Sequence, residues 1–220
     1  MREVARAIGT DSRIGPKFLN AGPGFGGSCF QKDILNLVYL CRHFGLPEVA
    51  DYWESVVALN TWQQHRIARL VVEKLFGTVT GKRLAILGFA FKADTNDTRE
   101  APAIRICRDL LEEGAQLAIN DPKVAAHQMA RDLQQEPAFQ AEALSGTGCW
   151  AQVRSIEDAV EGADAVLVLT EWKEYCNLNW MSLARRMRKP AWVFDSRSVA
   201  DPDNVRAAGL TLWRVGDGDG

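Results

Sequence analysis

A cysteine and an aspartate stand four residues apart, where a glycine-rich loop meets a predicted helix. The segment AGPGFGGSCFQKD, residues 21–33, has four glycines before Cys29, and apolar residues at helical spacing follow it. The free N–H groups of a helix N-terminus and a nearby cation, here Lys32, favour the thiolate form of a cysteine. Asp33 lies one turn further along the same face, where a carboxylate can transfer protons. The pattern predicts a nucleophilic thiol with a neighbouring acid–base group.

Two interpretations of Cys29 are open on spacing alone. Glycines bring backbone N–H groups close together, and such a nest can hold an anion or an oxyanion. A single cysteine at the start of a helix is, however, more often a small buried apolar residue. Cys41 and Cys107 fall on apolar helix faces and are expected in the core.

Composition argues against several classes of function. The 220 residues carry a net charge of −2, which argues against a nucleic acid or an anionic membrane as partner. The longest apolar runs are too short to cross a bilayer, and the first residues do not resemble a secretion signal. The five cysteines form no C-x-x-C pair and the three histidines have no metal-binding spacing. We therefore expect no disulfide framework, no metal site and a cytoplasmic location.

Two units are expected to position these residues. Helices are predicted over residues 1–9, 29–44 and 47–77, and the last, about 45 Å long, is typical of a helix that bridges domains or subunits. Apolar runs alternate with helices after residue 79, which predicts an α/β fold with a Rossmann-like, doubly wound parallel sheet. The expected strands are residues 83–90, 115–121, 151–155, 164–172, 190–197 and 210–215. The expected units are residues 1–78, helical, and 79–220, α/β.

Two stretches of the α/β unit do not fit the alternation. Residues 135–150 have weak periodicity and read as an insertion, and the C-terminal GDGDG is expected to be disordered.

A resemblance covers nearly the whole chain. The segment GFGGSCFQKDILNLVYLCRHFGLPEV, residues 24–49, is similar to the active-site segment of the UDP-glucose/GDP-mannose dehydrogenase family, and most similar to the members that act on UDP-glucose. The similarity continues through LAILGFAFKADTNDTRE, NDPKV, LVLTEW and VFDSR. The family oxidises the C6 alcohol of a nucleotide sugar to a carboxylate in two hydride transfers. The resemblance implies UDP-glucose as substrate, UDP-glucuronate as product and NAD as cofactor.

The resemblance also implies roles for single residues. Cys29 matches the family's nucleophile, which forms a thiohemiacetal and then a thioester, and Asp33 matches an aspartate that assists proton transfer. Arg99 and Lys32 are expected on the cofactor side, and Arg13 matches an arginine that reaches the substrate of a neighbouring subunit. The remaining positions that match contacts to the sugar nucleotide are Phe18, Leu19, Phe25, Gly26, Phe30, Phe91, Lys92 and Arg197. The long helix from Pro47 matches a dimer-forming helix, which implies a homodimer or a larger homo-oligomer.

Departures from the family pattern lie close to these contacts. Asn20 stands where the relatives usually carry lysine, Gly22 and Pro23 replace a Ser-Val-like pair, and Ser196 and Ser198 replace other residues. Without the resemblance, the charged loop KADTNDTRE would be typical of a solvated surface, and Arg197 could pair with a nearby aspartate.

None of the predicted strands is followed by the glycine fingerprint of dinucleotide binding. The strand end LGFAFK lacks the glycines that let a pyrophosphate approach a helix N-terminus. In the family this fingerprint belongs to an N-terminal Rossmann domain, so we expect this chain alone to be inactive. Two alternatives are a catalytically inactive module that binds a UDP-sugar and dimerises, and a dehydrogenase of another nucleotide sugar, such as GDP-mannose or UDP-N-acetylmannosamine.

Overall fold

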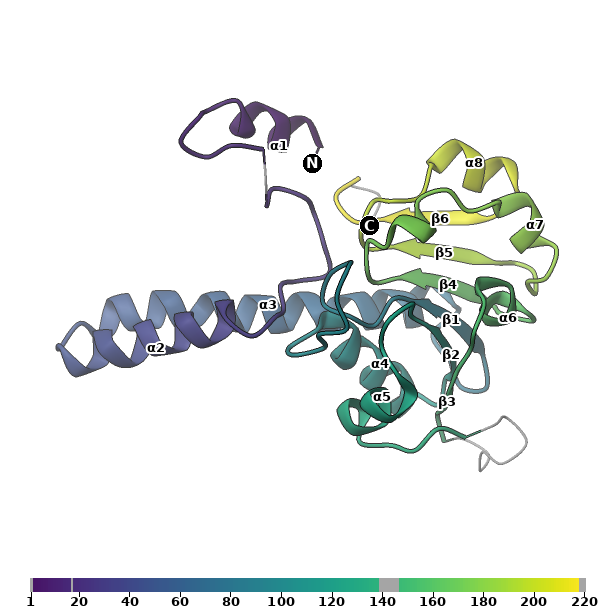
Figure 1. The fold of residues 1–220 in the computed structure, drawn as a ribbon, viewed down its shortest axis with the longest axis horizontal. Coiled ribbons are helices and arrows are strands. Elements are labelled where there is room, and N and C mark those ends of the chain that lie inside the picture. The colour runs from purple at the N-terminus through teal and green to yellow at the C-terminus, as the bar shows by residue number, and fades with distance from the viewer. Residues whose placement is uncertain (1, 17, 139–146, 218–220) are drawn as a thin grey trace.

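The structure, a computed structural model, describes residues 2–16, 18–138 and 147–217. Figure 1 shows a helical hairpin that projects from a six-stranded sheet, with the N-terminal segment standing apart from both. The N-terminal segment contains helix α1 (Arg2–Gly9), and the hairpin consists of α2 (Phe30–His43) and α3 (Pro47–Lys74).

Local sequence signals set the ends of the hairpin helices. Gly45 has a φ of 74°, a left-handed conformation that glycine adopts without strain and that ends α2. Pro47 begins α3, since a first-turn residue needs no free N–H. The two helices pack through a small apolar cluster of Ile34, Val38, Cys41 and Ala50.

The sheet is entirely parallel, with the strand order β3-β2-β1-β4-β5-β6. Its strands are β1 (Arg83–Leu87), β2 (Gln116–Asn120), β3 (Cys149–Gln152), β4 (Ala165–Val168), β5 (Trp192–Asp195) and β6 (Thr211–Arg214). The chain reverses its direction of travel across the sheet between β1 and β4, so the crevice at the carboxyl ends of these two strands is the topological switch point. Ligands of doubly wound sheets bind in such a crevice.

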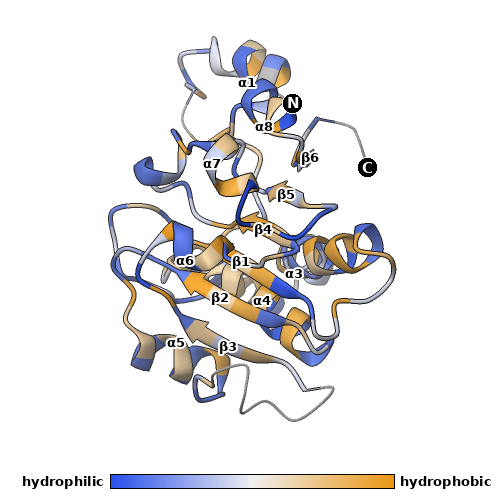
Figure 2. Cartoon of the chain, turned by 90° about the vertical axis from the view of Figure 1, so that its right-hand side faces the viewer, coloured by the Kyte–Doolittle hydropathy of each residue, from blue (hydrophilic) through white to orange (hydrophobic). Residues whose placement is uncertain are grey.

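Helices cover the sheet and exclude water from its strands. They are α4 (Pro102–Glu112), α5 (Ala126–Leu133), α6 (Ile156–Val160), α7 (Trp180–Ala184) and α8 (Pro202–Ala207), with a short 3-10 helix at Lys173–Tyr175. Figure 2 shows strands that are mostly hydrophobic in the middle of the molecule, and helices around them in which hydrophobic and hydrophilic residues alternate. The last turns of α3 join the same core through Ile67, Leu70 and Val71.

The predicted α/β fold with a parallel sheet is confirmed, and the differences concern the ends of elements. β3 begins at Cys149 rather than at residue 151, because Cys149 and Trp150 are buried and pair with β2. Residues 139–146 of the expected insertion and residues 218–220 of the tail lie outside the described residues.

Candidate functional site

Helix α3 holds the glycine-rich loop, residues 21–28, from one side. The buried side chain of Asn60 binds the backbone of Phe25 twice: Oδ1 accepts from the N–H at 2.8 Å and Nδ2 donates to the C=O at 3.0 Å. The Gln63 Nε2 group donates to the C=O of Gly22 at 3.3 Å. The loop thus gains from helix side chains the hydrogen bonds that regular secondary structure would otherwise supply.

The loop after β1, residues 88–101, holds the glycine loop from the other side. The Gly27 N–H donates to the C=O of Arg99 at 2.8 Å. A Cβ on Gly26 would lie 2.3 Å from the Glu100 carbonyl oxygen, and one on Gly27 would lie 3.0 Å from the ring of Phe91. Glycine is therefore required at both positions for the two loops to approach this closely.

The glycine loop does have the spacing G-x-G-x-x-G, at Gly22, Gly24 and Gly27, although no strand precedes it. A Cβ on Gly24 would lie 2.6 Å from Asn60 Oδ1, and the ring of Phe91 fills the space that a side chain at Gly27 would need. These glycines make room for protein groups rather than for a pyrophosphate, so the spacing is not a dinucleotide fingerprint.

The first turn of the sheet does not fit the pyrophosphate of NAD either. Gly88 follows β1 with a φ of 95°, but a Cβ there would lie 2.4 Å from Thr170 Cβ, so the neighbouring strand's loop occupies that space. The chain then runs through residues 89–101 before α4 begins at Pro102. A dinucleotide site needs a short glycine turn directly into a helix N-terminus, and this turn lacks it.

Cys29 lies at the N-terminal end of α2 and is exposed. Its C=O accepts the N–H of Asp33 at 2.8 Å, and its sulfur lies 3.4 Å from Ser28 Oγ. The buried alternative is therefore wrong for Cys29, whereas Cys41 and Cys107 are buried as expected. The thiol is open to a substrate at the position predicted from the sequence.

The other predicted residues of α2 lie beside the thiol. Lys32 and Asp33 are exposed in its first turn. Phe30 is half exposed, and its ring packs edge-on against that of Phe25, with 4.7 Å between the ring centroids.

Arg197 lies at the switch point of the sheet, two residues after β5. Its Nε donates to the C=O of Leu169 at 2.8 Å, and its Nη2 donates to the C=O of Phe91 at 3.1 Å. Glu171 Oε2 lies 3.2 Å from Nε but accepts no hydrogen bond, so the pair is held by charge. Burial lowers the pKa of Arg197, and the charges of Glu171 and Asp195 oppose that shift.

This arginine adjoins the glycine loop. Its side chain is only 15% exposed, and a Cβ on Gly22 would lie 3.5 Å from its Nη1. Lys92 is exposed nearby, with Nζ 5.3 Å from the ring centroid of Phe91. The structure thus brings a buried and an exposed cation together at the crevice where a parallel sheet binds ligands.

Arg99 lies on the cysteine side of the β1–α4 loop. Its guanidinium binds Asp97 through Nε at 2.9 Å and Nη2 at 2.6 Å. These hydrogen bonds raise the pKa of Arg99, and the negative charge of a Cys29 thiolate adds a smaller contribution. The backbone of Arg99 is joined to the glycine loop through Gly27, two residues before Cys29.

The N-terminal segment does not join this cluster. Arg13 pairs with Asp11 at 2.7 Å, and its side chain is 87% exposed. Phe18 is fully exposed, with a φ of 61°, and Leu19 packs near Gly9 of its own segment. Figure 1 shows this segment away from the glycine loop, so three predicted substrate residues are not brought to Cys29 within this chain.

Three further residues shape the site. Asp121, buried after β2, accepts the N–H groups of Phe89 at 2.7 Å and Ala90 at 3.0 Å, which fixes the start of the β1–α4 loop. Asn60 and Glu171 act as described above. Asn60 was detectable as a polar residue within the apolar stripe of α3. Asp121 and Glu171 lie in the segments NDPKV and LVLTEW that carry the resemblance, but the sequence assigned neither of them a role.

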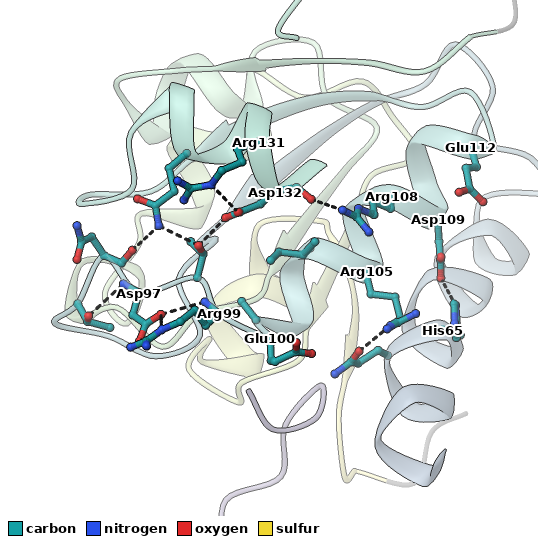
Figure 3. A pocket seen from close by; sticks show the side chains of 17 residues that line it. His65, Asp97, Arg99, Glu100, Arg105, Arg108, Asp109, Glu112, Arg131 and Asp132 are labelled. Atoms are coloured by element: carbon teal, nitrogen blue, oxygen red, sulfur yellow. Dashed lines mark hydrogen bonds and ion pairs between the residues drawn. The ribbon is translucent and has the colours of Figure 1, made fainter. Parts of the chain in front are cut away.

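A cleft of about 1110 Å³ lies next to the site and does not include Cys29. It lies among α3, α4, α5 and the β1–α4 loop, and Figure 3 shows acidic and basic side chains from all four lining it. His65 of α3 and Asp109 of α4 meet there at 2.6 Å. The cleft and the glycine loop share Arg99 and Glu100 as a common wall.

Metal centres and membrane spans are two further kinds of functional feature. Within residues 2–16, 18–138 and 147–217, no three side chains of the metal-binding types gather as a metal would need. Across the same residues, no helix has the length and apolar character to span a membrane.

Comparison with known proteins places these features in one family. Residues 1–62 match the central domain, and residues 85–202 the UDP binding domain, of the UDP-glucose/GDP-mannose dehydrogenase family. The chain is 49% identical to UDP-glucose 6-dehydrogenase 3 of Oryza sativa subsp. japonica and 48% identical to UDP-glucose 6-dehydrogenase 1 of Arabidopsis thaliana. Each match covers 97% of this chain and 46% of the relative, so the chain spans about half the length of these relatives.

A solved structure agrees with this result. The UDP-glucose dehydrogenase of the archaeon Pyrobaculum islandicum superposes with a TM-score of 0.71 at 27% identity, covering 98% of this chain and 43% of that one. The match to the UDP binding domain spans more than half of the chain, and the chain therefore belongs to the UDP-glucose/GDP-mannose dehydrogenase family.

Proposed function

We propose that this chain is the thiol-bearing and substrate-binding part of a dehydrogenase that oxidises UDP-glucose to UDP-glucuronate with NAD. The observation that carries the proposal is the exposed Cys29 at a helix N-terminus, on a loop that runs beside Arg197 at the switch point. Relatives named as UDP-glucose 6-dehydrogenases support UDP-glucose as the substrate.

The thiol chemistry begins at the aldehyde level. The Cys29 thiolate adds to the C6 carbonyl carbon, a C–S bond forms, and the carbonyl electron pair moves to oxygen, which takes up a proton. That carbon then loses a hydride, which NAD held by the rest of the dehydrogenase would accept, and the hydroxyl loses its proton, which leaves a thioester. Water adds to the thioester carbonyl, the C–S bond breaks, and the carboxylate and the free thiol result. Asp33, one turn away, is proposed to exchange protons with oxygen and water in these steps.

The binding half of the proposal rests on charge and shape. Arg197 and Lys92 supply positive charge for the diphosphate of a UDP-sugar, and the glycine loop presents backbone groups beside them. The aromatic rings of Phe25, Phe30 and Phe91 line the same region. NAD has no cradle in the described part of the sheet, so we propose that the chain does not turn over alone.

A homo-oligomer is part of the proposal. The α2–α3 hairpin leaves large apolar side chains exposed, among them Tyr39, Phe44, Tyr52, Leu59 and Trp62. Such a surface is typical of an interface. Arg13 is then proposed to act at the site of a neighbouring subunit, since it does not reach Cys29 of its own chain. Sedimentation equilibrium tests this, and a monomer at all concentrations would contradict it.

Calorimetry of UDP-glucose binding tests the substrate. We expect Arg197→Ala to abolish binding, whereas the matched change Arg206→Ala on exposed α8 should leave it intact. Tighter binding of GDP-mannose or UDP-N-acetylmannosamine than of UDP-glucose would instead favour another nucleotide-sugar dehydrogenase.

The aldehyde form of UDP-glucose tests the thiol step without any cofactor. It should protect Cys29 from iodoacetamide more strongly than UDP-glucose does, because only the aldehyde can form the adduct. Equal protection by the two compounds would refute the nucleophile role. NADH formation by this chain alone would refute the proposed inactivity and exclude the purely binding module.

A further inference from the structure

The part of the β1–α4 loop that contacts the glycine loop is fixed from behind by α5. Thr98 is only 4% exposed. Its hydroxyl donates to the carboxylate of Asp132 and accepts from Gln128 Nε2 at 2.8 Å. The same Gln128 amide donates to the C=O of Asn96 at 2.8 Å. Figure 3 shows Asp132 directed toward the loop that carries Asp97 and Arg99.

The next two residues of this loop contact the glycine loop. The C=O of Arg99 accepts the Gly27 N–H at 2.8 Å, and the Glu100 backbone lies against Gly26. Cys29 follows two residues after Gly27. Residues 98–100 therefore join α5 on one side to the thiol-bearing loop on the other.

We propose that Thr98 is a positioning residue for the reacting thiol. Held by Asp132 and Gln128, it fixes residues 98–100, and these fix the glycine loop and Cys29. The proposal rests on the proposed function only in taking Cys29 as the reacting group.

The hydroxyl is the essential feature of Thr98, because the site uses it both as a donor and as an acceptor. Valine has nearly the same shape but can do neither, whereas serine can do both. Release of the loop would not expose Cys29 further, since it is already exposed. Release would instead remove the Arg99 carbonyl from the Gly27 N–H and let Cys29 leave its place at the N-terminus of α2. The reactivity of a thiol depends on such surroundings.

Alkylation by iodoacetamide, followed by peptide mass spectrometry, tests the proposal. Cys176 is the internal reference, because it is an exposed thiol near α7, outside both loops. In Thr98→Val we expect the ratio of the Cys29 rate to the Cys176 rate to fall about threefold or more, and in Thr98→Ser to return close to the wild-type value. Gln128→Met should lower the ratio in the same direction, and it serves if the valine variant does not fold.

Thr80→Val is the matched control, since the Thr80 hydroxyl donates only to the C=O of Glu113, away from the site. An unchanged or higher ratio in Thr98→Val and Gln128→Met would overturn the proposal, as would a fall that serine does not reverse. UDP-glucose binding is measured on the same samples. Its absence in the wild type would contradict the proposed function and leave the alkylation result valid.

Discussion

Replacing Gly26 by alanine is expected to separate the glycine loop from the β1–α4 loop. The new Cβ would lie 2.3 Å from the Glu100 carbonyl oxygen, about 0.7 Å inside the 3.0 Å limit of real Cβ contacts, and the obstacle is backbone that no rotamer change can move. The shift lengthens the 2.8 Å hydrogen bond from the Gly27 N–H to Arg99 to roughly 3.5 Å, the edge of the bonding range. Overpacking and the lost hydrogen bond together cost about 2–4 kcal/mol of unfolding free energy.

Urea denaturation measures the free energy, and hydrogen exchange of the Gly27 amide reports the broken bond directly. Gly45→Ala is the control: its φ is left-handed, at 74°, and no atom beyond the adjoining residues lies within 4 Å of the new Cβ. The control should lose about 1–2 kcal/mol from backbone strain alone and leave Gly27 protected. A Gly26→Ala protein that keeps both its stability and the protection of Gly27 would refute the close contact between the loops.

Three further predictions concern other parts of the molecule. Asn60→Leu should lower the free energy of unfolding measured in urea by about 2–4 kcal/mol, because it leaves the N–H and C=O of Phe25 unpaired. A negligible loss would contradict the role of Asn60 in holding the glycine loop. Iodoacetamide should label the two exposed cysteines in the native protein and the three buried cysteines only on unfolding. Burial also raises the pKa of the Cys107 thiol, which slows its reaction further. Labelling of Cys107 before unfolding would contradict its burial in the core of the α/β unit. Burial raises the pKa of Asp195 above 3.8, so the folded state holds the carboxyl proton more tightly than the unfolded chain does. The free energy of unfolding that this proton contributes is complete below pH 3.8 and is lost as the pH rises through the raised pKa. Asp195→Asn should remove this dependence from a pH series of urea midpoints, and an unaltered series would show that another group is responsible.

The sheet and the hairpin could be predicted because their signals are local. Gly45 and Pro47 mark helix ends through their own backbone preferences, and the apolar runs of β1 and β4 are continuous because parallel strands are buried on both faces. The start of β3 could not be predicted this way. Cys149 and Trp150 belong to the strand because β2 offers them partners, and pairing across the sheet leaves no mark in a four-residue segment.

The candidate site could be predicted only where its residues are adjacent in the chain. Cys29 and Asp33 follow from a glycine loop that enters a helix. Phe91 and Arg197 are 106 residues apart and meet only through the strand order. The resemblance implied a sugar-nucleotide contact for each of them but not their contact with one another. Thr98 was not recognised, because the importance of a buried hydroxyl depends on which groups another element places around it.

Helix α3 belongs to both apolar clusters, with Ala50 in that of the hairpin and Val71 in that of the sheet. Its 28 residues form one continuous rod about 42 Å long, and Asn60 stands at its midpoint. The same helix packs the hairpin, holds Phe25 of the glycine loop at its midpoint and enters the core of the sheet. The separation between the exposed apolar surface of the hairpin and the thiol-bearing loop is therefore fixed by the length of a single helix.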